Sequence, residues 1–397
     1  MDRNTIDPKY KWRTEDLFET DKAWEETYNK LNNDIDKFSD FKGRVTESAK
    51  TLLECLKLYD ELCEVLNKLY VYSNLCFHID SRDTFYHTLA DKADMILVKF
   101  SSETSFIVPE ITKLDEETLK SYMNEEEGLK IYAHEFDTIM RKKAHTLSVE
   151  VEGVLAKTSD ISSAADNIFA MINDADMVFP DILNKDGEKL PLTKGNYIMY
   201  LESSDRVLRE NAFNALYDTY LKQKNTIAAT YYESVKKDVF YSKIRNYKSS
   251  MSMALADDNI PEKVYDNLIE TVRKNLGLMH RYVKLRKKLL GLDEIHMYDL
   301  YTPLVKDVDM KITYEEAKEK VIEGLKPLGE NYIETLKSGL SGGWIDVYET
   351  PGKRGGAYSW GAYPGHPYVL LNHKDNINST FTLAHEMGHA LHSYFKW

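Results

Sequence analysis

The sequence contains few residues that interrupt regular structure or cross-link it. Its 397 residues include only 18 glycines, 10 prolines and 3 cysteines. Cys55, Cys63 and Cys76 lack the C-x-x-C spacing of a redox motif or a zinc knuckle. We therefore expect them to be small buried residues of a reduced, cytoplasmic protein. The scarcity of Gly and Pro favours a mainly helical chain.

The sequence also lacks the signals of two other classes of protein. No apolar run approaches the roughly 20 residues that a membrane span requires. The first eight residues have no apolar stretch typical of a signal peptide. The net charge of −13 does not provide the basic surface that nucleic-acid binding needs. We expect neither a membrane nor a nucleic acid as a partner.

Apolar residues recur at helical spacing over most of the first half. Trp24, Tyr28, Leu31, Ile35 and Phe38 step by four and three residues, which indicates one face of an amphipathic helix. The same period predicts further helices, and their short connections favour an antiparallel N-terminal bundle. These helices are expected over 46–75, 82–107, 115–145 and 149–176.

A change of pattern near residue 180 predicts a boundary between domains. Asp186-Gly187 lies between two short apolar runs, a signal for a β-hairpin. We place an N-terminal helical domain over 1–190 and the first part of a catalytic domain over 191–397. In the second part, helices are expected over 206–245, after Pro261 and after the capping pair of Thr313 and Glu316, and short strands over 344–348, 355–360 and 367–372.

The most informative motif is His385-Glu386-Met387-Gly388-His389. On a helix, residues i and i+4 lie on one face, so the imidazoles of His385 and His389 can hold one zinc ion. Glu386 can then act as a base toward water at that ion. Gly388 inside the helix predicts close packing against the metal floor or a strand. The motif predicts a zinc peptidase whose site lies beside a small β-sheet.

A catalytic zinc site needs a third protein ligand. A metzincin would place a histidine at position 395, which is Phe395, so that class is excluded. The remaining class uses a glutamate well downstream, and residues 390–397 contain no acid. His392 shares the helix face, and we expect it to support the site as a neighbour of the ligands. Because the helical pattern continues to Trp397 without a stop signal, we expect the glutamate to lie in a C-terminal segment beyond residue 397.

Residues before the motif are candidates for binding the substrate. Gly355, Gly356, Ala357 and Tyr358 form a loop in which the missing Cβ atoms let a peptide backbone approach closely. Tyr368 lies in the following apolar run, and a strand beside a metal helix can pair with an extended peptide. We expect these five residues to contact oligopeptide substrates.

Several segments resemble oligoendopeptidase F, a bacterial branch of the thimet oligopeptidase-like zinc peptidases. They are residues 12–18, 205–209, 353–358, 367–372 and 381–393. The resemblance implies a largely helical protein with a zincin-like catalytic domain, one zinc ion, a cytoplasmic location and cleavage of short peptides at internal bonds. It assigns His385 and His389 as ligands and Glu386 as the catalytic carboxylate.

Three other functions fit parts of the sequence. A non-catalytic helical peptide-binding fragment would explain the absence of a third ligand from this chain. An aminopeptidase would need groups that capture a free amine, and no clear candidate is present. A structural scaffold would leave His385, Glu386 and His389 without a role.

Overall fold

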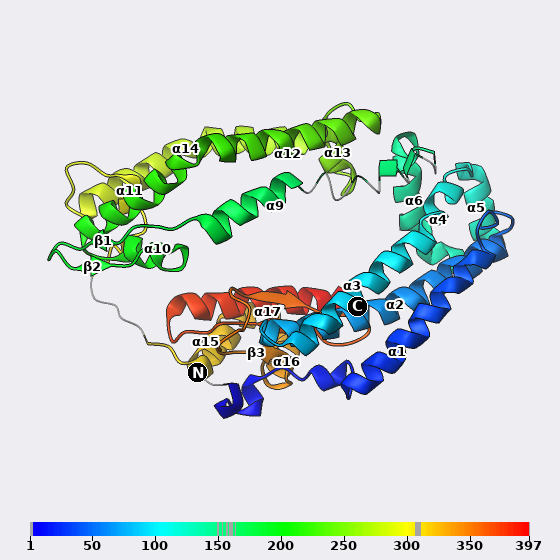
Figure 1. The fold of residues 1–397 in the computed structure, drawn as a ribbon, viewed down its shortest axis with the longest axis horizontal. Helices are drawn as coiled ribbons and strands as arrows, with labels where there is room; N and C mark the ends of the chain where they lie inside the picture. The colour runs from blue at the N-terminus through cyan, green and yellow to red at the C-terminus, as the bar shows by residue number, and fades with distance from the viewer. Residues whose placement is uncertain are drawn as a thin grey trace. The chain divides into compact units, whose positions relative to one another are not determined.

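The computed structural model describes residues 3–148, 151–152, 154–155, 158, 162, 164–305 and 311–396. The chain is mainly α-helical with two small sheets, as the sequence predicts (Figure 1). It forms two compact units, residues 1–134 with 309–397 and residues 135–308. The predicted domain boundary at residue 190 stays a prediction. Within the described residues, no helix combines the length and apolar character that crossing a membrane requires.

Long helices form the first part of the first unit. They are α1 (Asp21–Asp34), α2 (Ala49–Ile79) and α3 (Thr84–Thr104), and the predicted helices over these regions are confirmed. Side chains of Thr20, Ser48 and Asp83 accept hydrogen bonds from the first turns and so define where the helices begin. The predicted stripe around Trp24 and Leu31 is buried. Its burial removes apolar surface from water and stabilises the bundle.

The region predicted as one helix over 115–145 is divided. It contains α5 (Glu116–Glu125), a 3-10 segment (Glu127–Tyr132) and α6 (Ala133–Lys142), after the short α4 (Ile107–Ile111). Glu126 has an extended backbone, which ends α5. The apolar period alone did not reveal this break, because it continues on both sides of Glu126.

The described residues of the second unit form the predicted hairpin and six α-helices. Strands β1 (Ile182–Leu183) and β2 (Lys189–Leu190) pair antiparallel across Gly187, whose φ is +82°. The predicted 206–245 helix is two helices that separate at Gln223, and Pro261 is the cap of the next long helix. Within 149–176, the described part forms α9 and a π-helical segment, and the rest lies outside the described residues. The helices are α9 (Ala164–Ala170), α10 (Lys194–Glu202), α11 (Arg206–Lys222), α12 (Lys224–Ile244), α13 (Ser250–Ala256) and α14 (Glu262–Leu289).

The last part of the first unit places a small sheet beside the motif helix. The helices are α15 (Tyr314–Leu325), α16 (Glu330–Ser341) and α17 (Ile377–Lys396). The strands are β3 (Ile345–Asp346), β4 (Tyr358–Trp360) and β5 (Tyr368–Leu370), in the order β3-β5-β4. β5 is parallel to β3 and antiparallel to β4, so β4 is an edge strand. The predicted strands are confirmed, although each is shorter than predicted.

A buried ion pair fixes the connection between β3 and β4. Lys353 Nζ lies 2.7 Å from Asp346 Oδ1, and the two side chains are 0% and 2% exposed. The ammonium group also donates to the carbonyls of Asp346, Tyr348 and Leu371, at 3.2, 2.7 and 2.5 Å. Arg3 donates to both carboxylate oxygens of Asp346 from the N-terminus. Burial lowers the pKa of Lys353, and the Asp346 carboxylate opposes that shift.

Removing one partner of this ion pair tests its contribution to stability. Asp346→Ala leaves the Lys353 ammonium buried without a counter-charge, and we expect a loss of about 3–5 kcal/mol in unfolding free energy. Urea denaturation measures the loss. Glu26→Ala, which removes one partner of an exposed pair with Lys22, is the control and should cost at most about 1 kcal/mol. Equal losses in the two variants would contradict the role given to Asp346.

Candidate metal site and adjoining cavity

Helix α17 separates a buried face from a polar face. Asn376 accepts a hydrogen bond from the backbone of Ser379 at 2.9 Å and caps the helix. Leu383, Met387 and Leu391 are 0% exposed and pack in a cluster with α15, α16, β3 and β5. Because this face is fixed by the core, the face that carries His385 and His389 is turned toward solvent.

The two histidines of the motif converge as ligands of one ion would. His385 Nε2 and His389 Nε2 are 3.1 Å apart, and the two rings lie at 85° with centroids 4.7 Å apart. Two nitrogens at about 2.0–2.1 Å from a tetrahedral zinc ion would be separated by about 3.3 Å. The pair therefore fits a shared divalent ion, because both imidazoles present the same ring nitrogen to one point.

Glu386 is the acid of the motif, and it is 8% exposed. Within the part of the chain that the structure describes, its carboxylate makes no hydrogen bond and no ion pair. A carboxylate without a protein partner is available to a ligand or a water molecule. Helical geometry places it on the arc next to His385 and His389. An acid beside two converging imidazoles is the donor set of a metal-assisted hydrolase.

The described residues do not supply a complete metal site. No cluster of three or more His, Cys, Asp or Glu side chains able to hold an ion occurs among them. His392 is exposed, and its side chain makes no hydrogen bond to any residue that the structure describes. Its predicted supporting role stays a prediction, as does the identity of a third ligand.

A cavity of about 380 Å³ borders the motif helix. Ser379 and Thr382 contribute from α17, and they share the helix face of Glu386 because the spacings are seven and four residues. The opposite wall is the predicted glycine loop, including Gly355, Gly356 and Ala357. The structure therefore brings three of the predicted substrate-binding residues to a cavity beside the first turns of the motif helix, and the motif residues do not line it.

Three glycines near the site, Gly355, Gly356 and Gly388, lie beside open space. A Cβ at Gly355 or Gly356 would meet nothing within 4 Å, so the loop is open on the cavity side, and Gly356 has a φ of +82° that other residues rarely adopt. A Cβ at Gly388 would also meet nothing within 4 Å. The prediction that Gly388 marks close packing is therefore wrong for the described structure, because no strand or side chain approaches it.

Asn372 closes the glycine loop from the end of β5. Its Nδ2 donates to the carbonyls of Arg354 and Gly356, each at 2.9 Å. Its Oδ1 is buried and has no hydrogen-bond partner among the described residues. Asn372 also lines the cavity. The sequence alone did not point to Asn372. Only the fold shows that its side chain bonds to residues 16 and 18 positions earlier in the chain.

Tyr358 and Tyr368 lie away from the cavity lining. The Tyr358 hydroxyl is 2.8 Å from His78 Nδ1, at the end of α2. Tyr368 is 1% exposed, and its hydroxyl donates to the Arg13 carbonyl at 3.1 Å. Burial raises the pKa of both phenols. Tyr368 belongs to an apolar cluster with Trp12, so it is not carried into the proposed substrate site.

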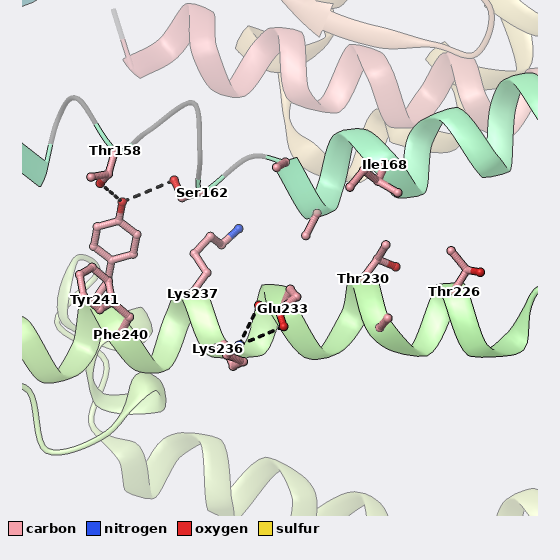
Figure 2. Close-up of a pocket in the computed structure, with 13 residues that line it drawn as sticks. Thr158, Ser162, Ile168, Thr226, Thr230, Glu233, Lys236, Lys237, Phe240 and Tyr241 are labelled. Carbon is pink, nitrogen blue, oxygen red and sulfur yellow. Dashed lines mark hydrogen bonds and ion pairs between the residues drawn. The ribbon is translucent and has the colours of Figure 1, made fainter.

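A larger cavity lies in the second unit, between α9 and α12 (Figure 2). Its volume is about 600 Å³, and apolar atoms such as those of Ile168 and Phe240 form much of its wall. Its charged groups are paired, Lys236 with Glu233 at 3.0 Å and Lys237 with Asp166 at 3.1 Å. The arrangement offers no group of acids, bases or ligands for catalysis, so we assign no function to it.

Comparisons with known proteins support the class of protein that the motif predicts. Residues 199–396 match the model of peptidase family M3, and residues 110–179 match the model described as oligopeptidase F. The oligopeptidase PepF of Bacillus subtilis is 46% identical over 394 residues, which cover 99% of this chain and 59% of that protein. The group B oligopeptidase PepB of Streptococcus agalactiae is 41% identical and covers 99% of this chain, with 65% of its own length matched.

Solved structures share the fold. A crystal structure from Chlamydophila abortus has a TM-score of 0.81 and 32% identity, and the match covers 99% of this chain and 66% of that one. Oligoendopeptidase-F from Enterococcus faecium has a TM-score of 0.66 and 37% identity over 81% of this chain and 60% of its own. The chain belongs to the metallopeptidase family M3. Within it, the similarity is to the oligopeptidase F proteins, of which the chain spans about three fifths to two thirds.

The burial of His78 predicts a pH dependence of stability. Burial, followed by the charge of Arg354, lowers the pKa of His78 to about 4 from 6.5. The folded state thus excludes a proton that the unfolded state takes up. The contribution of the neutral His78 to the free energy of unfolding is present in full above pH 6.5. About 3 kcal/mol of it is lost as the pH falls from 6.5 to 4.

Urea unfolding of the wild type and of His78→Gln between pH 7.5 and 4 isolates this effect. The stability difference between the two proteins should narrow or reverse as the pH falls, because glutamine does not titrate. A difference that is constant over this range would contradict the low pKa of His78.

Proposed function

We propose that this protein is a zinc metalloendopeptidase that hydrolyses internal bonds of short oligopeptides. The observation that carries the proposal is the convergence of His385 Nε2 and His389 Nε2 at 3.1 Å beside the carboxylate of Glu386, which has no partner among the described residues. The similarity to oligopeptidase PepF and to oligoendopeptidase-F supports the same class of reaction.

Glu386 is the proposed general base. When bound, zinc would supply Lewis acidity toward the scissile carbonyl and would lower the pKa of water from 15.7 to about 7. Glu386 takes a proton from the attacking water and transfers it to the leaving amine. His385 and His389 would hold the ion through Nε2.

Extended peptides are the proposed substrates. The cavity beside α17 is bounded by a loop whose glycines leave room for a main chain. Asn372 lines this cavity, and its Nδ2 holds the carbonyls of Arg354 and Gly356 in the loop. β4 is an edge strand, and an edge strand can pair with an extended peptide through backbone hydrogen bonds. Gly355, Gly356 and Ala357 are the residues that we assign to this contact.

The remaining parts of the proposal come from the sequence. The third zinc ligand is proposed to be a glutamate beyond residue 397, as the resemblance to oligoendopeptidase F implies, and the chain spans 59% and 65% of the two oligopeptidases compared above. A second candidate is a peptide-binding fragment without catalysis, which fits the lack of a three-residue ligand cluster among the described residues. The unpaired Glu386 favours catalysis. A cytoplasmic location is proposed because Cys55, Cys63 and Cys76 are free thiols.

Metal binding is tested first. The intact protein is purified, loaded with zinc and dialysed. It should then retain about one zinc ion per chain, as measured by atomic emission. His389→Ala removes one of the two converging nitrogens and should lose at least about 90% of the bound zinc. His280→Ala, at an exposed position on α14, is the matched control and should retain the ion. Full occupancy in His389→Ala would rule out this ligand.

Catalysis is tested with a change that preserves shape. Glu386→Gln keeps the volume of the side chain and removes its basicity. Hydrolysis of a fluorogenic oligopeptide by the intact protein should fall by about 10²–10⁴-fold, while the zinc content is unchanged. Glu334→Gln, on the exposed side of α16, should be as active as the wild type. Undiminished turnover by Glu386→Gln would remove Glu386 from the mechanism.

A further inference from the structure

His78 connects the end of α2 to the glycine loop, although it is 276 residues away from Arg354 in sequence. The side chain is 8% exposed. Arg354 Nη1 lies 2.6 Å from His78 Nε2, and the Arg354 backbone N–H donates to the His78 carbonyl at 2.9 Å. The Tyr358 hydroxyl lies 2.8 Å from His78 Nδ1. One buried residue thus holds both ends of the segment 354–358.

The partners of His78 determine its protonation state. An arginine guanidinium is always a donor, so His78 Nε2 must accept from Arg354. In the neutral ring the proton then lies on Nδ1, and it is donated to the Tyr358 oxygen. The ring acts as an acceptor toward Arg354 and as a donor toward Tyr358. An imidazolium could not do this, since both of its nitrogens would be donors.

The loop is also fixed from other directions, and its cavity side is left free. Ser81 N–H donates to the Gly352 carbonyl at 2.8 Å, and Asn372 holds the carbonyls of Arg354 and Gly356. Lys353 is anchored in the buried ion pair with Asp346. A Cβ atom added at Gly355 or Gly356 would have no neighbouring atom within 4 Å. These bonds therefore define the shape of the loop without filling the space beside it.

We propose that His78 is a positioning residue for peptide binding, which acts through Arg354 and Tyr358 to hold the loop 353–358 as a preformed wall of the cavity beside α17. This inference rests on the proposed peptidase function. Fixing the backbone of a residue costs conformational entropy. A loop ordered in advance does not incur this cost when the peptide binds. The loop contacts the main chain of the substrate and not the reacting atoms, so its order affects KM and leaves kcat unchanged.

The test is a double-mutant cycle on the intact protein with a fluorogenic oligopeptide. His78→Phe keeps a buried ring and removes both hydrogen bonds, so KM should rise by about tenfold while kcat changes by less than about twofold. His78→Gln should restore most of the affinity, because its amide can accept from Arg354 and donate to Tyr358. In an Arg354→Ala background, His78→Phe should raise KM by less than about threefold, because the two residues act on one loop.

Hydrogen exchange supplies a readout that does not need activity. Backbone amides of residues 353–358 should exchange at least about tenfold faster in His78→Phe than in the wild type, while those of α17 are unchanged. His87→Phe, at an exposed position on α3, is the matched control and should alter neither KM nor exchange. If His78→Phe does not fold, Tyr358→Phe removes only the bond to Nδ1 and should produce a smaller rise in KM and in loop exchange.

The outcomes separate this inference from the proposed function. A protein that neither retains zinc nor cleaves peptides refutes the function, and the exchange measurement then still decides whether His78 orders the loop. A protein that binds zinc and cleaves peptides, but in which His78→Phe alters neither KM nor loop exchange, overturns the inference. An equal rise in KM from His78→Phe with and without Arg354 also overturns it, because His78 would then act independently of Arg354.

Discussion

The arrangement of the site depends on the buried ion pair between Lys353 and Asp346. Asp346 lies in β3, and Lys353 starts the loop that ends in β4, so the pair joins the first strand of the sheet to the wall of the cavity. The ammonium group reaches Leu371 at the end of β5 as well. A charge taken out of water at this position must keep all of its partners, because losing one leaves it both unsolvated and unpaired. This requirement restricts the loop to one conformation, in which the glycines face open space.

Helix α17 supplies the second constraint. Its apolar face packs Leu383, Met387 and Leu391 into the core, and this orientation leaves His385 and His389 on the opposite side. Glu386 lies at the border between the two faces, where it is buried but remains unpaired among the described residues. The same periodicity that secures the helix therefore sets the different environments of Glu386 and of the two histidines, which are exposed.

Periodicity and spacing predicted the elements better than their ends. The 3.6-residue stripe around Trp24 predicted α1, and the motif predicted one helix with His385 and His389 on one face. The breaks at Glu126 and Gln223 were missed, because apolar spacing continues across both. Contacts such as His78 with Arg354, or Asn372 with Gly356, could not be predicted from a single sequence, since only the folded chain brings those residues together. Tyr368 was expected at the substrate because a strand beside the motif helix can pair with an extended peptide. Its side chain is buried in the apolar cluster with Trp12.

The central claim is that His385 and His389 bind one zinc ion through Nε2. X-ray absorption at the zinc edge of the intact, metal-loaded protein tests it most directly. The account predicts two imidazole nitrogens at about 2.0–2.1 Å with oxygen ligands completing the shell, and the loss of that imidazole signal when both histidines are replaced. A shell without imidazole, or one that is the same after both replacements, would contradict it.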